Sequence, residues 1–139
     1  MNGYFGKTTD KGLHWSYMNI GTEAELTALN FRKNVGVLIA VDSTIFVTTN
    51  HGEDWRRIEF PSLDLRSIVF LSDSTAVLSC SNGRIIKSKD LFRTFSVSVT
   101  PSSTEIKGIH FVDDIRGVLL DKNGLMAKTT NGGSNWTNV

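Results

Sequence analysis

Several features that mark common protein classes are scarce or absent in this sequence. Its 139 residues contain one cysteine, Cys80, which excludes an internal disulfide and, in an apolar run, is typical of a buried structural thiol. No apolar run approaches the ~18 residues of a membrane-spanning helix, so membrane insertion is not expected. Residues 1–7 lack a signal-peptide pattern, so the sequence does not predict the compartment. If the chain is cut from a longer secreted precursor, the expected location is extracytoplasmic.

Neither sign of charge is in excess, because 15 Lys and Arg residues balance 14 Asp and Glu residues. A chain without a strong net field is a poor candidate for nucleic-acid binding. A phosphate-binding glycine loop, a Gly-x-Ser-x-Gly elbow and a cysteine pair are missing, and the three histidines hold unrelated positions. The sequence therefore predicts no cofactor, no metal site and no nucleic-acid partner.

What the sequence does contain is a repeat. Four eight-residue segments, 8–15, 48–55, 88–95 and 129–136, align without gaps at intervals of about 40 residues. Each begins with Ser or Thr and has Asp or Asn at its third position; in three of them Gly follows at the fifth position and Trp at the eighth. In the third copy Phe92 and Phe95 replace the glycine and the tryptophan, and we expect a distorted turn there.

Four short strands are predicted in each repeat, because short runs rich in β-branched residues alternate with turn signals. Asn82-Gly83 is a strong hairpin signal, and Pro61 and Pro101 fall between repeats. Repeated four-stranded antiparallel units of this length predict an all-β chain with the fold of a β-propeller, of about three and a half blades. Stacked solenoid repeats are the alternative.

The predicted boundaries are a hairpin of third and fourth strands from an incomplete blade at 3–22, and blades at 23–60, 62–100 and 104–139. A propeller normally has ~4–8 blades, so such a chain would leave an apolar sheet face open at each end. We therefore expect the chain to be part of a larger propeller. Completion by a homo-oligomer is the alternative.

The repeated segments predict turns that build blades and do not form a ligand site. The third side chain can accept hydrogen bonds from its own turn, the glycine permits a left-handed conformation, and the aromatic residue can cover the hairpin end. Four copies of one constellation favour a structural role. The residues to which we assign it are Asp10, Gly12, Trp15, Asn50, Gly52, Trp55, Asp90, Phe95, Asn131, Gly133 and Trp136.

These segments resemble the Asp-box, or bacterial neuraminidase repeat, with the pattern Ser/Thr-x-Asp/Asn-x-Gly-x-x-Trp. Residues 109–117 followed by 124–136 resemble the photosystem II stability/assembly factor-like branch of these repeat proteins. The resemblance covers nearly the whole chain and implies a β-propeller. It implies little about function, because similar boxes occur in sialidases, sortilin-type receptors, xyloglucanases and assembly factors.

Resemblance to sialidases would imply an arginine triad, a Tyr–Glu nucleophile pair and an acidic proton donor. This set cannot be placed, since the only tyrosines, Tyr4 and Tyr17, lie in the incomplete unit. We interpret the remaining loop and strand-end acids as solvated turn residues: Asp64, Glu105, Asp113, Asp114 and Asp121. No catalytic residue is assigned, and we do not expect an enzyme.

Basic residues at the start of the first strands are the candidate ligand residues. Thr27, Arg66 and Lys107 hold equivalent places, and the first strand of a blade lines the central channel. Arg66 and Lys107 could receive a carboxylate or an anionic loop, or could pair with neighbouring acids. The candidate ligand face, opposite the repeated turns, comprises Asp64, Arg66, Arg84, Glu105 and Lys107.

Two functions stay open. The first is a non-catalytic scaffold for protein binding or complex assembly, which the lack of a catalytic set favours. The second is a carbohydrate-binding or glycoside-hydrolase-related, sialidase-like module with a glycan partner. Aromatic residues for sugar stacking are nearly absent from the loops of the candidate ligand face, which favours a protein partner.

Overall fold

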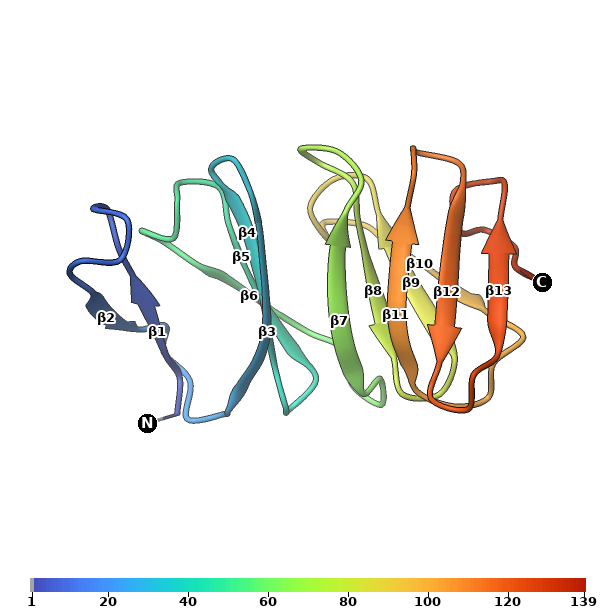
Figure 1. Ribbon diagram of the computed structural model, residues 1–139. Helices are drawn as coiled ribbons and strands as arrows, with labels where there is room; N and C mark the ends of the chain where they lie inside the picture. Colours follow the sequence, from blue (N-terminus) through green and yellow to red (C-terminus); the bar gives the residue numbers. More distant parts are fainter. Residues whose placement is uncertain (1) are drawn as a thin grey trace.

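The structure is a computed structural model that describes residues 2–139, and within this range it consists of β-strands and turns (Figure 1). None of its described segments is a helix long and apolar enough to cross a membrane. The strands are β1 (Tyr4–Lys7), β2 (Ser16–Asn19), β3 (Leu26–Arg32), β4 (Val35–Ala40), β5 (Thr44–Thr48), β6 (Arg56–Glu59), β7 (Leu65–Phe70), β8 (Ala76–Cys80), β9 (Arg84–Ser88), β10 (Ser96–Val99), β11 (Ile106–Phe111), β12 (Gly117–Asp121), β13 (Met126–Thr129) and β14 (Thr137–Asn138).

These strands form antiparallel sheets in chain order. Strands β3 to β6, β7 to β10 and β11 to β14 make three four-stranded sheets, and β1 pairs with β2 in a two-stranded one. This meander arises because apolar runs of strand length are separated by tight turns, so that each strand pairs with the next along the chain. Pro61 and Pro101, which cannot donate to a ladder, lie in the connections between sheets.

The core lies between successive sheets. Val37 and Ile45 on one face of the β3–β6 sheet cluster with Leu65 and Ile68 of the next sheet. The β7–β10 sheet repeats the arrangement through Val77 against the β11–β14 sheet. Because both faces of β4 and β8 are covered, every residue of these strands is buried. Burial likewise raises the pKa of the Cys80 thiol to about 11, as expected of a structural cysteine.

The hairpin of β1 and β2 packs on the other face of the β3–β6 sheet. Phe5 of β1 is buried against Leu38 and Phe46. Among the first strands of the three full sheets, β7 contacts both β3 and β11, so the three strands follow one another side by side (Figure 1). The sheets therefore fan out from a common line of first strands, with their fourth strands outermost, which is the arrangement of propeller blades.

The side chains of each repeated turn accept hydrogen bonds from the backbone of the same turn. In the turn 48–55 the Thr48 hydroxyl accepts hydrogen bonds from the N–H groups of Asn50 and Gly52, at 3.3 and 3.0 Å. The Asn50 side-chain oxygen accepts one from the Asp54 N–H, and the Trp55 indole N–H donates to the Gly52 carbonyl. The turns 8–15 and 129–136 contain the same set of bonds.

The distortion expected in the third turn, residues 88–95, does not occur. The Ser88 hydroxyl still accepts from the Phe92 N–H at 2.7 Å, and Asp90 still accepts from the Thr94 N–H at 2.9 Å. Phe92 adopts the left-handed conformation of the replaced glycine, with φ of 62°. Its side chain is buried and packs edge-on against Phe60. This burial offsets the backbone strain, which for a non-glycine residue is of the order of 1 kcal/mol.

The closing aromatic residues are not all buried as expected. Trp136 is 7% exposed, whereas Trp15 is 54% exposed. Trp55 and Trp136 each pack edge-on against a phenylalanine at the end of the first strand of their own sheet, Phe31 and Phe111, with ring centroids 6.0 and 5.9 Å apart. Within the described chain Trp15 has no such partner, since the two-stranded sheet lacks a first strand; Phe95 is 49% exposed and packs against Phe60 and not against the first strand of its own sheet.

The third turn predicts a pH dependence of stability. Hydrogen bonds from the Thr94 hydroxyl and the Thr94 N–H, together with one from Ser88, lower the pKa of Asp90 to about 2. A carboxylate whose pKa is lowered by folding stabilises the protein above its ordinary pKa of about 4, and this contribution is lost as the pH falls toward 2. Asp90→Asn preserves the turn, since Asn50 and Asn131 serve elsewhere. We expect the difference in unfolding free energy between wild type and this variant, measured with urea, to shrink between pH 5 and pH 2. A constant difference would contradict the assignment.

Candidate functional site

The candidate site lies where the three first strands begin. Near its start, each first strand contains a β-bulge, so that Thr27 in β3, Arg66 in β7 and Lys107 in β11 have no partner on the second strand. A bulge bends the strand and redirects the side chain of the extra residue. Equivalent bulges in neighbouring first strands therefore present three side chains at one end of the line of first strands.

Acidic neighbours hold the two basic side chains in one network. The Arg66 guanidinium lies 2.5 Å from the Asp64 carboxylate and 3.9 Å from that of Glu105. Lys107 Nζ lies 2.9 Å from Glu105 Oε2. The hydrogen bond from Lys107, with the positive charges of Lys107, Arg66 and Lys122, holds the pKa of Glu105 below its usual value. Glu105 is therefore ionised at neutral pH.

A hollow of about 440 Å³ opens at this network. Its lining residues are Thr27, Val41, Asp64, Leu65, Arg66 and Glu105. Arg66 and Lys107 are each about half exposed. A guanidinium carries five N–H donors and an ammonium three, so donors remain after the contacts with Asp64 and Glu105. The arrangement can hydrogen-bond an incoming carboxylate while the resident acids keep the site close to neutral.

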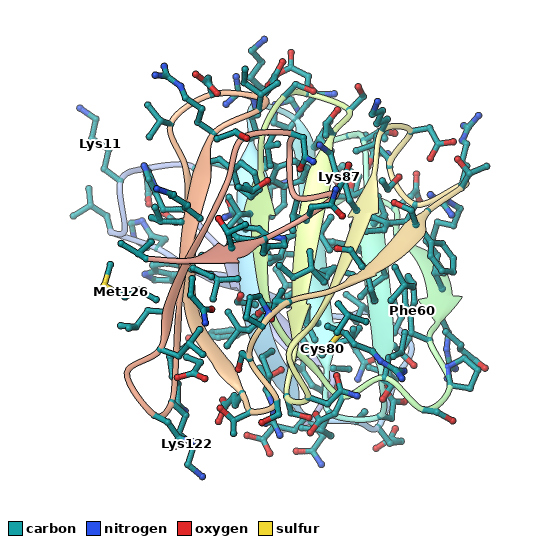
Figure 2. The ribbon with its side chains drawn as sticks, turned by 90° about the vertical axis from the view of Figure 1, so that its right-hand side faces the viewer. Lys11, Phe60, Cys80, Lys87, Lys122 and Met126 are labelled. Atoms are coloured by element: carbon teal, nitrogen blue, oxygen red, sulfur yellow. The ribbon has the colours of Figure 1, made fainter. Side chains whose placement is uncertain are left out.

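The other basic residue of the candidate face lies apart from this network. Arg84 begins β9, opposite Val99 of β10, and does not line the hollow. Lys122 lies in the turn between β12 and β13, at the opposite end of the molecule from Lys11 of the first repeated turn (Figure 2). The network of Asp64, Arg66, Glu105 and Lys107 and the repeated turns thus occupy opposite ends of the sheets.

One acid differs from its interpretation as a solvated turn residue. Asp121 is buried, and its carboxylate accepts hydrogen bonds from the Ser102 and Thr104 hydroxyls and from the N–H groups of Asn123 and Leu125. Chiefly the bond from Ser102 lowers its pKa. This carboxylate ties the connection before β11 to the turn after β12. Its acceptor capacity is used structurally.

The basic residues could be identified from the sequence, but the bulges that orient their side chains were not predicted. A small residue follows each bulge residue, namely Ala28, Ser67 and Gly108, and this is a signal that the sequence does contain. Residues 2–139 hold no cluster of three or more His, Cys, Asp or Glu side chains that could hold a metal ion.

Comparison with known proteins identifies the fold. No protein-family profile matches the chain, and no curated protein sequence matches it. The solved structure of YCF48 bound to a D1 peptide is similar, with a TM-score of 0.78 and 19% identity over 99% of this chain. YCF48 from Cyanidioschyzon merolae (TM-score 0.74, 18% identity over 98% of the chain) and an ancestral GH74 enzyme (0.80, 16% over 96%) are also similar. The chain is a β-propeller segment.

The predicted all-β propeller fold is thereby confirmed. The propeller segment spans 46%, 42% and 21% of the lengths of these three proteins. At such identities the likeness concerns the fold alone. The propeller fold accounts for the fanned sheets and for the line of first strands that contains Arg66 and Lys107.

The site predicts that its ion pairs contribute little to stability. Exposed pairs are typically worth about 0–1 kcal/mol, because water and salt screen them. We expect the double variant Arg66→Ala/Lys107→Ala to lower the free energy of unfolding by less than about 2 kcal/mol, as measured by urea denaturation. A loss several times larger would mean that the network is a structural element.

Proposed function

We propose that the propeller segment is a non-catalytic scaffold that binds a protein partner through a carboxylate at Arg66 and Lys107. The observation that carries this proposal is a pair of half-exposed cations on equivalent β-bulges: Arg66 lines the hollow, and Lys107 contacts Glu105 of its lining. A guanidinium hydrogen-bonds a carboxylate in a bidentate manner, and an adjacent ammonium adds charge. A C-terminal carboxylate or an acidic side chain of an extended segment fits these donors.

The acids beside these cations support a binding role over glycoside hydrolysis. Hydrolysis by paired carboxylates requires one acid that stays protonated near neutral pH as the proton donor. Glu105 has the opposite property, because Lys107 and Arg66 lower its pKa. Asp64 is held by Arg66 at 2.5 Å. Glu105, held ionised by these cations, lacks the proton that the leaving group needs.

The repeated turns support assignment of the chain to the Asp-box repeat proteins, within the photosystem II assembly factor-like branch. Four turns share the Ser/Thr and Asp/Asn hydrogen bonds that the pattern requires. One similar structure, that of YCF48, has a bound D1 peptide. By analogy, the partner of this chain is a peptide segment of an assembling protein, and the chain acts as part of a larger propeller.

Carbohydrate binding is the second candidate, and the opposite end of the sheets favours it. Two grooves of about 390 and 400 Å³ lie beside consecutive repeated turns. Trp55 with Arg56 and Arg93 lines the first, and Phe95 with Lys87 lines the second. An aromatic ring beside polar side chains suits a sugar. The hollow at Arg66 has no aromatic side chain in its lining.

Peptide selection tests the protein-binding proposal. Peptides with free C-termini are selected from a random library on the propeller segment, and the best binder is synthesised as the free acid and as the amide. Calorimetry measures two comparisons with the wild type binding the free acid. We expect the amide to bind the wild type at least about tenfold more weakly, and the free acid to bind the Arg66→Ala/Lys107→Ala variant at least about tenfold more weakly. The reason is that a charged hydrogen bond is worth about 1.5–3 kcal/mol.

Arg57→Ala is the matched control. Arg57 is similarly exposed and also contacts two acids, Asp42 and Glu59, but it lies on the outer strand β6. Its loss should leave peptide affinity unchanged. Equal binding by the wild type and the double variant would contradict the proposal. Glycan binding that is lost in Trp55→Ala and kept in the double variant would establish the second candidate instead.

A further inference from the structure

The inner edge of β1 is unpaired in the described chain. Strands β5, β9 and β13, which hold the equivalent third position in their sheets, pair with a neighbour on both sides. Among residues 2–139, β1 pairs with β2 alone. Its other side presents the N–H and C=O groups of an open sheet edge, which is a template for another strand.

Beside this edge lies an apolar hollow of about 240 Å³. Its lining residues are Tyr4, Phe5, Leu26, Thr27, Ala28, Leu29 and Leu38. Leu29 of β3 is 49% exposed, whereas Ile68, at the equivalent place in β7, is 5% exposed. The difference arises because a full sheet, with its first and second strands, covers Ile68. The hollow is thus the space that first and second strands fill elsewhere in this molecule.

The exposed ring of Trp15 is a second sign of the missing first and second strands. Trp55 and Trp136 contact Phe31 and Phe111, the last apolar residues of the first strands in their sheets. Trp15 belongs to the hairpin that lacks a first strand, and its ring is about half exposed. A phenylalanine at the equivalent position would give Trp15 the edge-on partner that Trp55 and Trp136 have, whereas the third counterpart, Phe95, packs against Phe60 and is 49% exposed.

The chain's own hairpins define what fits this place. In each full sheet a phenylalanine of the first strand pairs with a small residue of the second, as Phe111 does with Gly117. The phenylalanine ring lies over that small residue, because a Cβ added at Gly36 or Gly117 would meet the ring of Phe31 or Phe111 at 2.5 or 2.8 Å. Aliphatic residues of the second strand then pack toward the next sheet, as Val37 does.

We propose that the open side of β1 is an acceptor site for a β-hairpin with this pattern: a strand ending in Phe, a short turn, and a strand beginning with Gly or Ala. The second strand of the hairpin adds antiparallel to β1 through main-chain hydrogen bonds. Its aliphatic residues cover Leu29, and its phenylalanine covers Trp15. This site is independent of the carboxylate site proposed above.

A synthetic peptide of residues 106–121, the β11–β12 segment, supplies the probe because it carries the whole pattern. Added to the propeller segment, it should bind saturably, slow amide hydrogen exchange in Tyr4–Lys7 and shift the indole N–H resonance of Trp15 more than those of Trp55 and Trp136. A Phe111→Ala peptide should bind at least about tenfold more weakly, because a buried phenylalanine contributes several times the energy of a tenfold change.

The chain offers a matched pair of variants. Leu29→Glu places a charge in the hollow and should abolish binding. Leu120→Glu places one on the outer face of the β11–β14 sheet, at a residue of similar exposure, and should leave binding intact. Far-UV circular dichroism checks that both variants are folded. As a second measurement, the same hairpin fused ahead of residue 1 by a Gly/Ser linker should raise Tm, and the increase should vanish with Leu29→Glu.

Several results would overturn the proposal. They are absence of both peptide binding and a Tm increase, binding that survives Leu29→Glu, or binding lost in Leu120→Glu, which would place the peptide on the other end of the molecule. Concentration-dependent association of the chain without peptide, with protection of β1, would show that a second copy occupies the edge. Unchanged exchange in Tyr4–Lys7 on saturation would show that no strand is added.

Discussion

Face-to-face burial of apolar side chains between successive sheets is the interaction on which the rest of this structure depends. Strands β4 and β8 are covered on both faces, and every one of their side chains is buried. No long-range ion pair or disulfide contributes comparably, because the ion pairs of residues 2–139 are exposed and the one cysteine is free. The repeated turns serve this packing, since their Ser/Thr and Asp/Asn side chains accept hydrogen bonds from several backbone N–H groups of the same turn at the end of a hairpin. In three of them one further N–H donates to the turn between the first and second strands, as that of His51 does to the Asn34 carbonyl.

Packing of this kind also explains where binding can occur. Bringing the sheets face to face aligns β3, β7 and β11, and their bulges then place Arg66 and Lys107 on either side of one acid, Glu105, which lines the hollow. The same packing reveals the incomplete sheet, because Leu29 is 49% exposed where Ile68, at the equivalent place in β7, is buried. The two proposed sites thus have one origin, although they bind different chemistry: a carboxylate at one end of the first strands, and a β-hairpin along β1.

Strand order and blade type could be predicted from the sequence, because they follow from local signals: apolar runs of strand length, Asn82-Gly83 and the repeated turns. Features that depend on distant residues could not. Phe92 keeps a left-handed turn because Phe60, far away in the chain, buries its ring. Asp121 is buried because Ser102 and Thr104 reach it from another connection. For the bulges at Arg66 and Lys107 the local signal is only the small residue that follows each, because a bulge is a change of register between two strands.

Native-state hydrogen exchange of the isolated propeller segment tests the central role of sheet-to-sheet packing most directly. If this packing holds the fold together, amides of β4 and β8, whose strands are covered on both faces, should exchange slowest and only on global unfolding. Amides of β1 and β2 should exchange fastest among the strands, because within the described chain no strand pairs with the inner edge of β1. Protection that is uniform across the strands, or stronger in β1 than in β8, would contradict the account.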